Sequence, residues 1–208
     1  MQIDAPPTLR ARKKAETWSA IHEAAAVLVL EHGIERATVE AVAEAAGVSP
    51  RTFFNYFPSK EDAVLGMRAP VLDPSLLEEF SLDHDVLGQV SRLLVAVTRS
   101  AYAGGDIGRR RKLVREHPQL GRRRHELTVE AEELVRRAVA DRLAQDPQWS
   151  AGIGAHDVDE VARMLVLLAG APLHFAISSP GRSTATGLTS EEHESALGLF
   201  HHLLTRLP

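Results

Sequence analysis

The chain has 208 residues and a formal net charge of −4, and 44% of its residues are hydrophobic and 25% charged. This balance is typical of a globular protein and excludes a low-complexity or strongly charged disordered chain. The absence of cysteine excludes disulfides, thiolate metal sites and cysteine nucleophiles. No apolar run has the length of a membrane span or of a signal-peptide core, so we expect a cytoplasmic protein without a membrane partner.

A first long helix is predicted from about Leu9 to His32, where Gly33 would end it. Its apolar residues repeat every three or four positions, which is typical of a buried stripe: Trp18, Ile21, Ala25 and Leu28. Four cations cluster at its beginning: Arg10, Arg12, Lys13 and Lys14. One interpretation of this cluster is a frayed, solvated tail, and the other is contact with the DNA backbone or minor groove.

A short helix and a tight turn are predicted next. Thr38 is a good N-cap, because its hydroxyl can accept from an unpaired backbone N–H of the first turn. Gly47 stands where a helix commonly ends in a left-handed residue. Ser49 then caps a second short helix, predicted from Pro50 to about Tyr56, with proline at its first position. Two helices joined by a turn of about three residues that contains Gly are the signature of a helix-turn-helix.

A third helix is predicted from Ser59 to about Ala69, with Asp62 as the capping-box partner of Ser59. Pro70 and Pro74 then bound a break in the helical pattern. We therefore place a domain boundary within residues 66–80.

In a helix-turn-helix, the second helix lies in the major groove with its N-terminal residues at base edges. Here these residues are Ser49, Pro50, Arg51 and Thr52. Arg51 can donate two hydrogen bonds to a guanine, and Thr52 can meet a thymine methyl group or a phosphate. The polar tips of Asn55 and Tyr56, one turn later, suit the DNA backbone. Lys60 begins the following helix, where backbone N–H groups favour an anion.

The residues that carry a wider resemblance are Thr38, Ala43, the run Ala46-Gly47-Val48-Ser49, Thr52, Phe54, Tyr56-Phe57 and Ser59-Lys60-Glu61. With this pattern, roughly residues 15–65 resemble the DNA-binding region of the TetR family of transcriptional regulators. The resemblance implies phosphate contacts by Thr38, Tyr56 and Lys60. Phe54 stands where the family usually has a tyrosine whose hydroxyl binds a phosphate, so packing is kept and that bond is absent. We interpret Phe53 and Phe57 as core anchors.

The charge of this region does not by itself predict DNA binding. Residues 1–70 contain 8 Lys and Arg against 9 Asp and Glu, whereas a DNA-binding domain is usually basic. We therefore expect an uneven distribution, with Arg51 and Lys60 at the motif. Glu40 and Glu44, four residues apart, would share a helix face that points away from phosphate.

The rest of the chain is predicted to be helical over residues 83–102, 107–117, 118–145, 157–178 and 190–206. The whole protein is thus assigned to the all-α class, with an N-terminal three-helix head that contains the helix-turn-helix and a C-terminal helical body. The predicted domains are residues 1–70 for DNA binding and residues 71–208 for effector binding and dimerisation.

The last two predicted helices have wide apolar faces, which either fill the core of the body or bind another chain. The family resemblance implies the second, a four-helix interface in a homodimer. The residues concerned are Val161, Leu165, Leu168, Pro172, Phe175, Leu197, Phe200 and Leu204. A twofold dimer would place two recognition helices one DNA turn apart and predicts a palindromic operator.

Residues 109–124 form the densest basic stretch, in which Glu116 is the only acid. A solvated charged face is one interpretation. However, residues 111–147 are similar to the bodies of a TetR subgroup that senses acyl-CoA-like ligands, including mycofactocin-type regulators, which implies an anion site where arginine forks bind phosphate. The candidate ligand-binding residues are Arg110, Arg111 and Arg123 for the anion, and Leu94, Met164, Leu167 and His174 for an apolar bore.

Other chemistry is weakly indicated. His193, His201 and His202 have no carboxylate at a matching ligand spacing, so we interpret them as surface residues and expect neither a metal nor a cofactor. The leading hypothesis is a regulator that binds double-stranded DNA as a homodimer, most simply a repressor released by a small hydrophobic or acyl-CoA-like effector. A DNA-binding activator or architectural protein without a ligand is the alternative. A helical enzyme is the third hypothesis, and the lack of catalytic motifs speaks against it. The operator, the regulated genes and the effector are not encoded in any motif.

Overall fold

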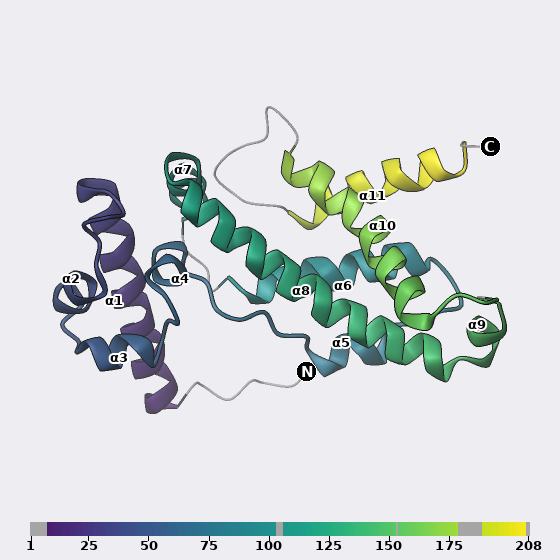
Figure 1. The fold of residues 1–208 in the computed structure, drawn as a ribbon, viewed down its shortest axis with the longest axis horizontal. Helices are drawn as coiled ribbons and strands as arrows, with labels where there is room; N and C mark the ends of the chain where they lie inside the picture. The colour runs from purple at the N-terminus through teal and green to yellow at the C-terminus, as the bar shows by residue number, and fades with distance from the viewer. Residues whose placement is uncertain (1–7, 103–105, 153, 179–188, 207–208) are drawn as a thin grey trace. The chain divides into compact units, whose positions relative to one another are not determined.

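The computed structural model describes residues 8–102, 106–152, 154–178 and 189–206, and the regular elements in these ranges are α-helices (Figure 1). The predicted all-α class is therefore confirmed. The described residues group into two compact units. The first takes in residues 8–68 and 109–123, and the second takes in residues 69–102, 106–108 and the chain from 124 onward. The segment 109–123, predicted to belong to the body, is thus grouped with the unit that contains the helix-turn-helix.

The first unit contains four helices that each begin after a capping residue, followed much later in the chain by further helical residues. They are α1 (Leu9–His32), α2 (Val39–Ala45), α3 (Pro50–Phe54) and α4 (Lys60–Leu65), with α7 (Ile107–Glu116) and the start of α8 (Pro118–Gln145). The hydroxyls of Thr38 and Ser49 accept from the third backbone N–H of α2 and α3. Gly47 between them has a φ of 68°, a left-handed conformation that glycine adopts without strain. The predicted caps and turn are confirmed.

Helix α4 ends earlier than predicted, because Gly66 stops it in a left-handed conformation with a φ of 61°. The ring of His22 lies directly over this glycine. Its Nδ1 pairs with the carbonyl oxygen of Ala63 at 2.8 Å. Burial lowers the pKa of His22, which favours the neutral ring as a donor to this carbonyl. A side chain from α1 therefore covers the end of α4.

Aromatic side chains form the centre of the first unit. Phe53 and Phe57 are completely buried, which confirms their interpretation as core anchors. The ring of Trp18 on α1 lies 5.0 Å from that of Phe57, and Ile21 and Val42 are also fully buried. The short helices α2 and α3, which could not be stable alone, are thus fixed on the long helix α1 by apolar packing.

The second unit contains α5 (Pro74–Glu78), α6 (Val86–Ser100), most of α8, α9 (Pro147–Gly152), α10 (Val158–Ser178) and α11 (Ser190–Leu204). Its core combines buried residues of α6, α8 and α10, such as Leu94, Val135 and Ala169. Two helices were not predicted, α5 and α9. Each has only one or two turns, so no apolar period develops in its sequence.

A buried polar contact joins α6 to α11. Ser91 Oγ lies 2.8 Å from His193 Nε2, and both residues are at most 2% exposed. Burial lowers the pKa of His193, so the pair is favoured as a neutral hydrogen bond. His193 was predicted to lie at the surface, and this was wrong. Its position was mistaken because a polar side chain can be buried where a partner satisfies it.

Helix α10 is apolar nearly all round, and the structure shows which face is outward. Val161 and Leu165 pack against the core, and Pro172 is buried, whereas Leu168 and Phe175 are exposed. On α11, Leu197 is buried, Phe200 is half-buried and Leu204 is exposed. The predicted interface set therefore mixes core and surface residues. The outward face also includes Met164 and Leu167, each 57% exposed.

The predicted apolar bore is not formed by the residues assigned to it. Leu94 is a core residue with 1% exposure, whereas Met164, Leu167 and His174 face outward on α10. These four side chains do not line one cavity. A helix with apolar residues on two faces carries no signal that separates the inner face from the outer one, which is why the assignment was wrong.

We expect Gly66→Ala to lower the free energy of unfolding by about 2 kcal/mol or more, measured by urea denaturation. The left-handed backbone alone costs an alanine about 1–2 kcal/mol, and an added Cβ would lie 2.8 Å from the His22 ring. The matched control is Gly198→Ala in α11, where an added Cβ meets nothing within 4 Å. That change should be neutral or stabilising by up to about 1 kcal/mol. Equal stability of the two variants would contradict the role given to Gly66.

Candidate nucleic-acid interface

Helix α3 presents polar groups at the surface of the first unit. Ser49, Pro50 and Arg51 at its beginning are exposed. Thr52 is half-buried, and its hydroxyl lies 2.9 Å from that of Ser49. Phe54 is 57% exposed, so its ring is available to a partner. The residues predicted to read base edges are thus on one accessible end of a short, anchored helix.

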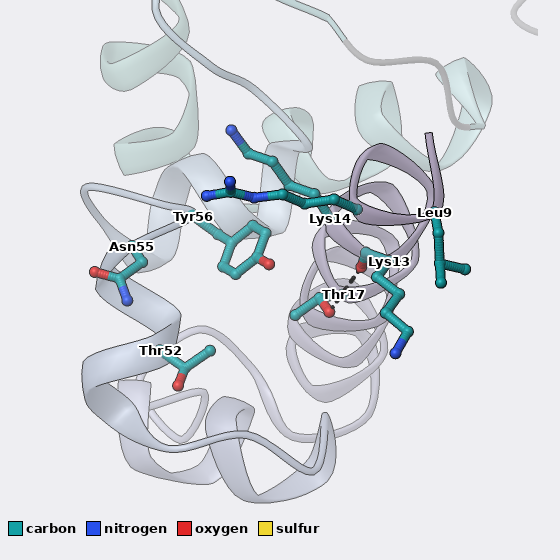
Figure 2. A pocket seen from close by; sticks show the side chains of 8 residues that line it. Leu9, Lys13, Lys14, Thr17, Thr52, Asn55 and Tyr56 are labelled. Carbon is teal, nitrogen blue, oxygen red and sulfur yellow. Dashed lines mark hydrogen bonds between the residues drawn. The ribbon is translucent and has the colours of Figure 1, made fainter. Parts of the chain in front are cut away.

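A hollow of about 620 Å³ lies between α3 and the first turns of α1. It is lined by Leu9, Arg10, Lys13, Lys14, Thr17, Thr52, Asn55 and Tyr56. Figure 2 shows Thr52 and Asn55 on one side, Leu9, Lys13 and Thr17 on the other, and the Tyr56 ring between them. Thr17 donates from its hydroxyl to the backbone oxygen of Lys13 at 3.0 Å. The structure therefore brings three cations to the end of the predicted recognition helix.

Three of the four predicted N-terminal cations line the hollow, and all four belong to helix α1. Arg10, Lys13 and Lys14 line the hollow, and Arg12 is not among its lining residues. They are part of a regular helix that begins at Leu9, and not of an extended tail. Thr17 was missed by sequence reasoning. Its spacing of four from Lys13 places both on one helix face and was the signal that could have found it.

The other two predicted phosphate contacts lie at helix beginnings. Thr38 is exposed, and its hydroxyl already accepts from the N–H of Ala41. Lys60 is half-buried, and its ammonium donates to the carbonyl oxygen of Ile34 at 2.9 Å. An ammonium has three donors, so this bond holds the side chain in place and leaves donors over.

Three arginines of the basic stretch bind groups of α1 and α4. Arg109 makes two hydrogen bonds of 2.7 Å to the Glu23 carboxylate, which lowers the pKa of that group. Arg110 Nε donates to the Leu65 carbonyl oxygen at 2.7 Å. Arg123 Nε donates to Asp62 Oδ1 at 2.8 Å. Arg110 and Arg123, predicted to hold a ligand anion, are thus engaged by the first unit itself, and Arg111 is half-buried.

The grouping of the chain also changes the charge of the DNA-binding region. Residues 1–68 hold 8 Lys and Arg against 9 Asp and Glu, and residues 109–123 add 7 against 1. The first unit therefore carries an excess of positive charge, although the whole chain has a net charge of −4. A positive unit with a cation-lined hollow can attract and hold a polyanion.

Other site chemistry finds little support among the described residues. They contain no group of three or more metal-ligating side chains. Within the same part of the chain, every helix is too short or too polar to cross a bilayer. The chemistry that the first unit offers is the binding of phosphate by Lys, Arg and hydroxyl groups and the reading of base edges from α3.

Part of this unit resembles known proteins. Residues 21–65 match the family described as bacterial regulatory proteins, tetR family. Over 59 residues, the chain is 48% identical to the HTH-type transcriptional regulator TcmR of Streptomyces glaucescens. That alignment spans 28% of this chain and 26% of TcmR, so it concerns the DNA-binding region alone.

Solved structures resemble the chain over more of its length but more loosely. GusR of Salmonella enterica is 22% identical with a TM-score of 0.43, and the match covers 91% of this chain and 95% of GusR. FadR of Thermus thermophilus, a TetR-family repressor solved in complex with lauroyl-CoA, is 24% identical with a TM-score of 0.39. In that case the match covers 88% of this chain and 93% of FadR.

Proposed function

We propose that this chain is a TetR-family transcriptional repressor that responds to a ligand. The single observation that carries the DNA-binding part is the hollow in which α1 cations meet the end of α3. Arg51 would read a base from the start of α3, and Arg10, Lys13, Lys14 and Tyr56 would hold the adjacent backbone. Base contacts would thus supply specificity, and phosphate contacts would supply register and affinity.

A homodimer is the second part of the proposal. It is supported by a set of large apolar side chains that are exposed on α10 and α11. These two helices pack against each other in the second unit (Figure 1). These residues are Met164, Leu167, Leu168, Phe175, Leu199, Leu203 and Leu204, each at least 41% exposed. An apolar surface of this kind is typical of a protein contact. Twofold symmetry would then require an inverted-repeat operator.

The third part is release by a small hydrophobic or acyl-CoA-like effector bound in the second unit. A hollow of about 300 Å³ there supports it, at the small end of the range for ligand sites. Its wall combines apolar Leu76, Phe80 and Leu93 with polar Glu79, His84, Gln89 and Arg92. The apolar groups could bind an acyl chain. An anionic group would have to share Arg92 with Asp85, which this arginine already binds at 2.7 Å. Effector and operator would each weaken the binding of the other by the same factor.

Selection of bound duplexes from a random pool tests the first two parts together. We expect an enriched inverted repeat, since two recognition helices would read it with twofold symmetry. Arg51→Ala should weaken operator binding by about 1–3 kcal/mol and relax the preference at one base pair in each half-site. The control Arg36→Ala removes an exposed arginine outside α3 and should keep the selected sequence. Enrichment of a single half-site would contradict the dimer, and no enrichment would contradict specific DNA binding.

The role of the cation-lined hollow is tested by salt dependence. We expect Lys13→Gln and Lys14→Gln each to weaken binding to all duplexes alike. Each should also flatten the slope of log Kd against log salt by about 0.9 for every phosphate that is no longer neutralised. Fluorescence anisotropy from about 50 to 200 mM salt would measure this. Lys112→Gln is the matched control, an exposed lysine in the same unit outside the hollow. Slopes that change equally in all three variants would show that the effect is general charge and not the hollow.

Calorimetry with palmitoyl-CoA and palmitate tests the effector. We expect palmitoyl-CoA to bind and to weaken operator binding, and palmitate, which has the chain without the phosphates, to bind far more weakly. Equal binding of both ligands, or of neither, would remove the argument for an anionic headgroup. Binding of palmitoyl-CoA that leaves operator affinity unchanged would separate the ligand from regulation, because linkage requires a mutual effect.

A further inference from the structure

Asp62 is a buried acid of the first unit. It lies in the first turn of α4 and is 1% exposed. One carboxylate oxygen accepts from the Ser59 hydroxyl at 2.8 Å, and the other accepts from Arg123 Nε at 2.8 Å. A buried carboxylate requires a cation or a full set of donors. The partner comes from the start of α8, 61 residues away in the sequence.

Arginines of α7, in the same segment 109–123, also bind the other end of α4 and the adjacent part of α1. Arg110 donates to the carbonyl oxygen of Leu65, the last residue of the helix. Arg109 holds Glu23 of α1, the residue next to His22, whose ring pairs with Ala63. Helix α4 has only six residues, which is too short to be stable by itself. Its position on α1 therefore depends on side chains from α1, α7 and α8.

Helix α4 in turn is connected to the helix-turn-helix. Phe57, two residues before the Ser59 cap, is fully buried against Trp18. Lys60 donates to Ile34, in the turn that leads into α2. A shift of the first turn of α4 would thus move the residues that follow α3 and those that lead into α2.

We propose that Arg123 is a positioning residue for DNA binding. By neutralising Asp62 it holds the first turn of α4, and so fixes the helix-turn-helix in its binding geometry, without contacting DNA. The inference rests on the proposed function. It assigns to the basic stretch an internal role in operator binding, where the sequence had predicted an anion ligand.

The test compares Arg123→Gln with Arg122→Gln in the full chain, using anisotropy with a selected operator duplex at a temperature where circular dichroism shows both folded. Arg122 is the exposed neighbour, so each variant removes one positive charge from the same turn of α8. We expect Arg123→Gln to weaken binding about tenfold, within the usual range of coupling between sites, with the wild-type salt slope. Arg122→Gln should bind within about twofold of wild type.

A neutral pair separates positioning from the mere removal of a charge. Asp62→Asn combined with Arg123→Gln leaves no uncompensated buried carboxylate, so it should bind more tightly than Arg123→Gln alone but still more weakly than wild type. If Arg123→Gln does not fold, this double variant carries the test. Wild-type affinity in the folded double variant would then show that the pair stabilises the unit without positioning it, and would overturn the proposal.

Three further results would overturn it. Equal affinities of Arg123→Gln and Arg122→Gln would remove any special role of the arginine. A salt slope lowered by about 0.9 in Arg123→Gln alone would make it a direct phosphate contact. The third result is additivity. If the effects of Asp62→Asn alone and Arg123→Gln alone on operator binding sum to that of the double variant, Arg123 does not act through Asp62. A wild-type chain that binds no duplex would instead overturn the proposed function, and the positioning role with it.

Discussion

The buried carboxylate of Asp62 imposes the constraint on which the DNA-binding unit depends. An ionised group at 1% exposure is tolerated only where charge and hydrogen bonds replace water. Ser59 and Arg123 supply these at 2.8 Å each. Because Arg123 lies in α8, the first unit is not complete at the end of α4. It also includes residues 109–123, from much further along the chain.

The same packing accounts for the electrostatics of the unit. The first 68 residues alone are close to neutral, since their acids slightly outnumber their bases. Segment 109–123 adds cations and pairs with two of those acids, Glu23 and Asp62. Cations on α1, including Lys13 and Lys14, then line the hollow beside α3. A region that looked too acidic for DNA binding thus gains a positive field once its actual members are counted.

Local chemistry was sufficient to predict most of the first unit. Thr38, Gly47, Ser49 and Pro50 act within a few residues of their own positions, so their effects can be inferred from sequence. The limits of α1 and α8 were also predicted, because long amphipathic helices repeat their signal many times. The end of α4 was not, since Gly66 stops the helix under a ring from α1. That contact joins residues far apart in the chain, and no local pattern reports it.

The basic stretch shows the same limit for function. Its arginines are chemically identical but can bind different partners, because a guanidinium suits a ligand phosphate, a DNA backbone or a protein carboxylate equally well. The sequence could not distinguish these partners, whereas the position of each side chain does. Arg109, Arg110 and Arg123 bind groups of the first unit.

Helix α8 shows why the basic stretch could not be assigned from its own sequence. Its residues up to Arg123 belong to the first unit, whereas Ala131, Val135, Val139 and Leu143 are buried in the core of the second. One helical period runs through both parts of this helix. The period therefore predicts the helix but carries no signal for where its contribution to one core ends and its contribution to the other begins.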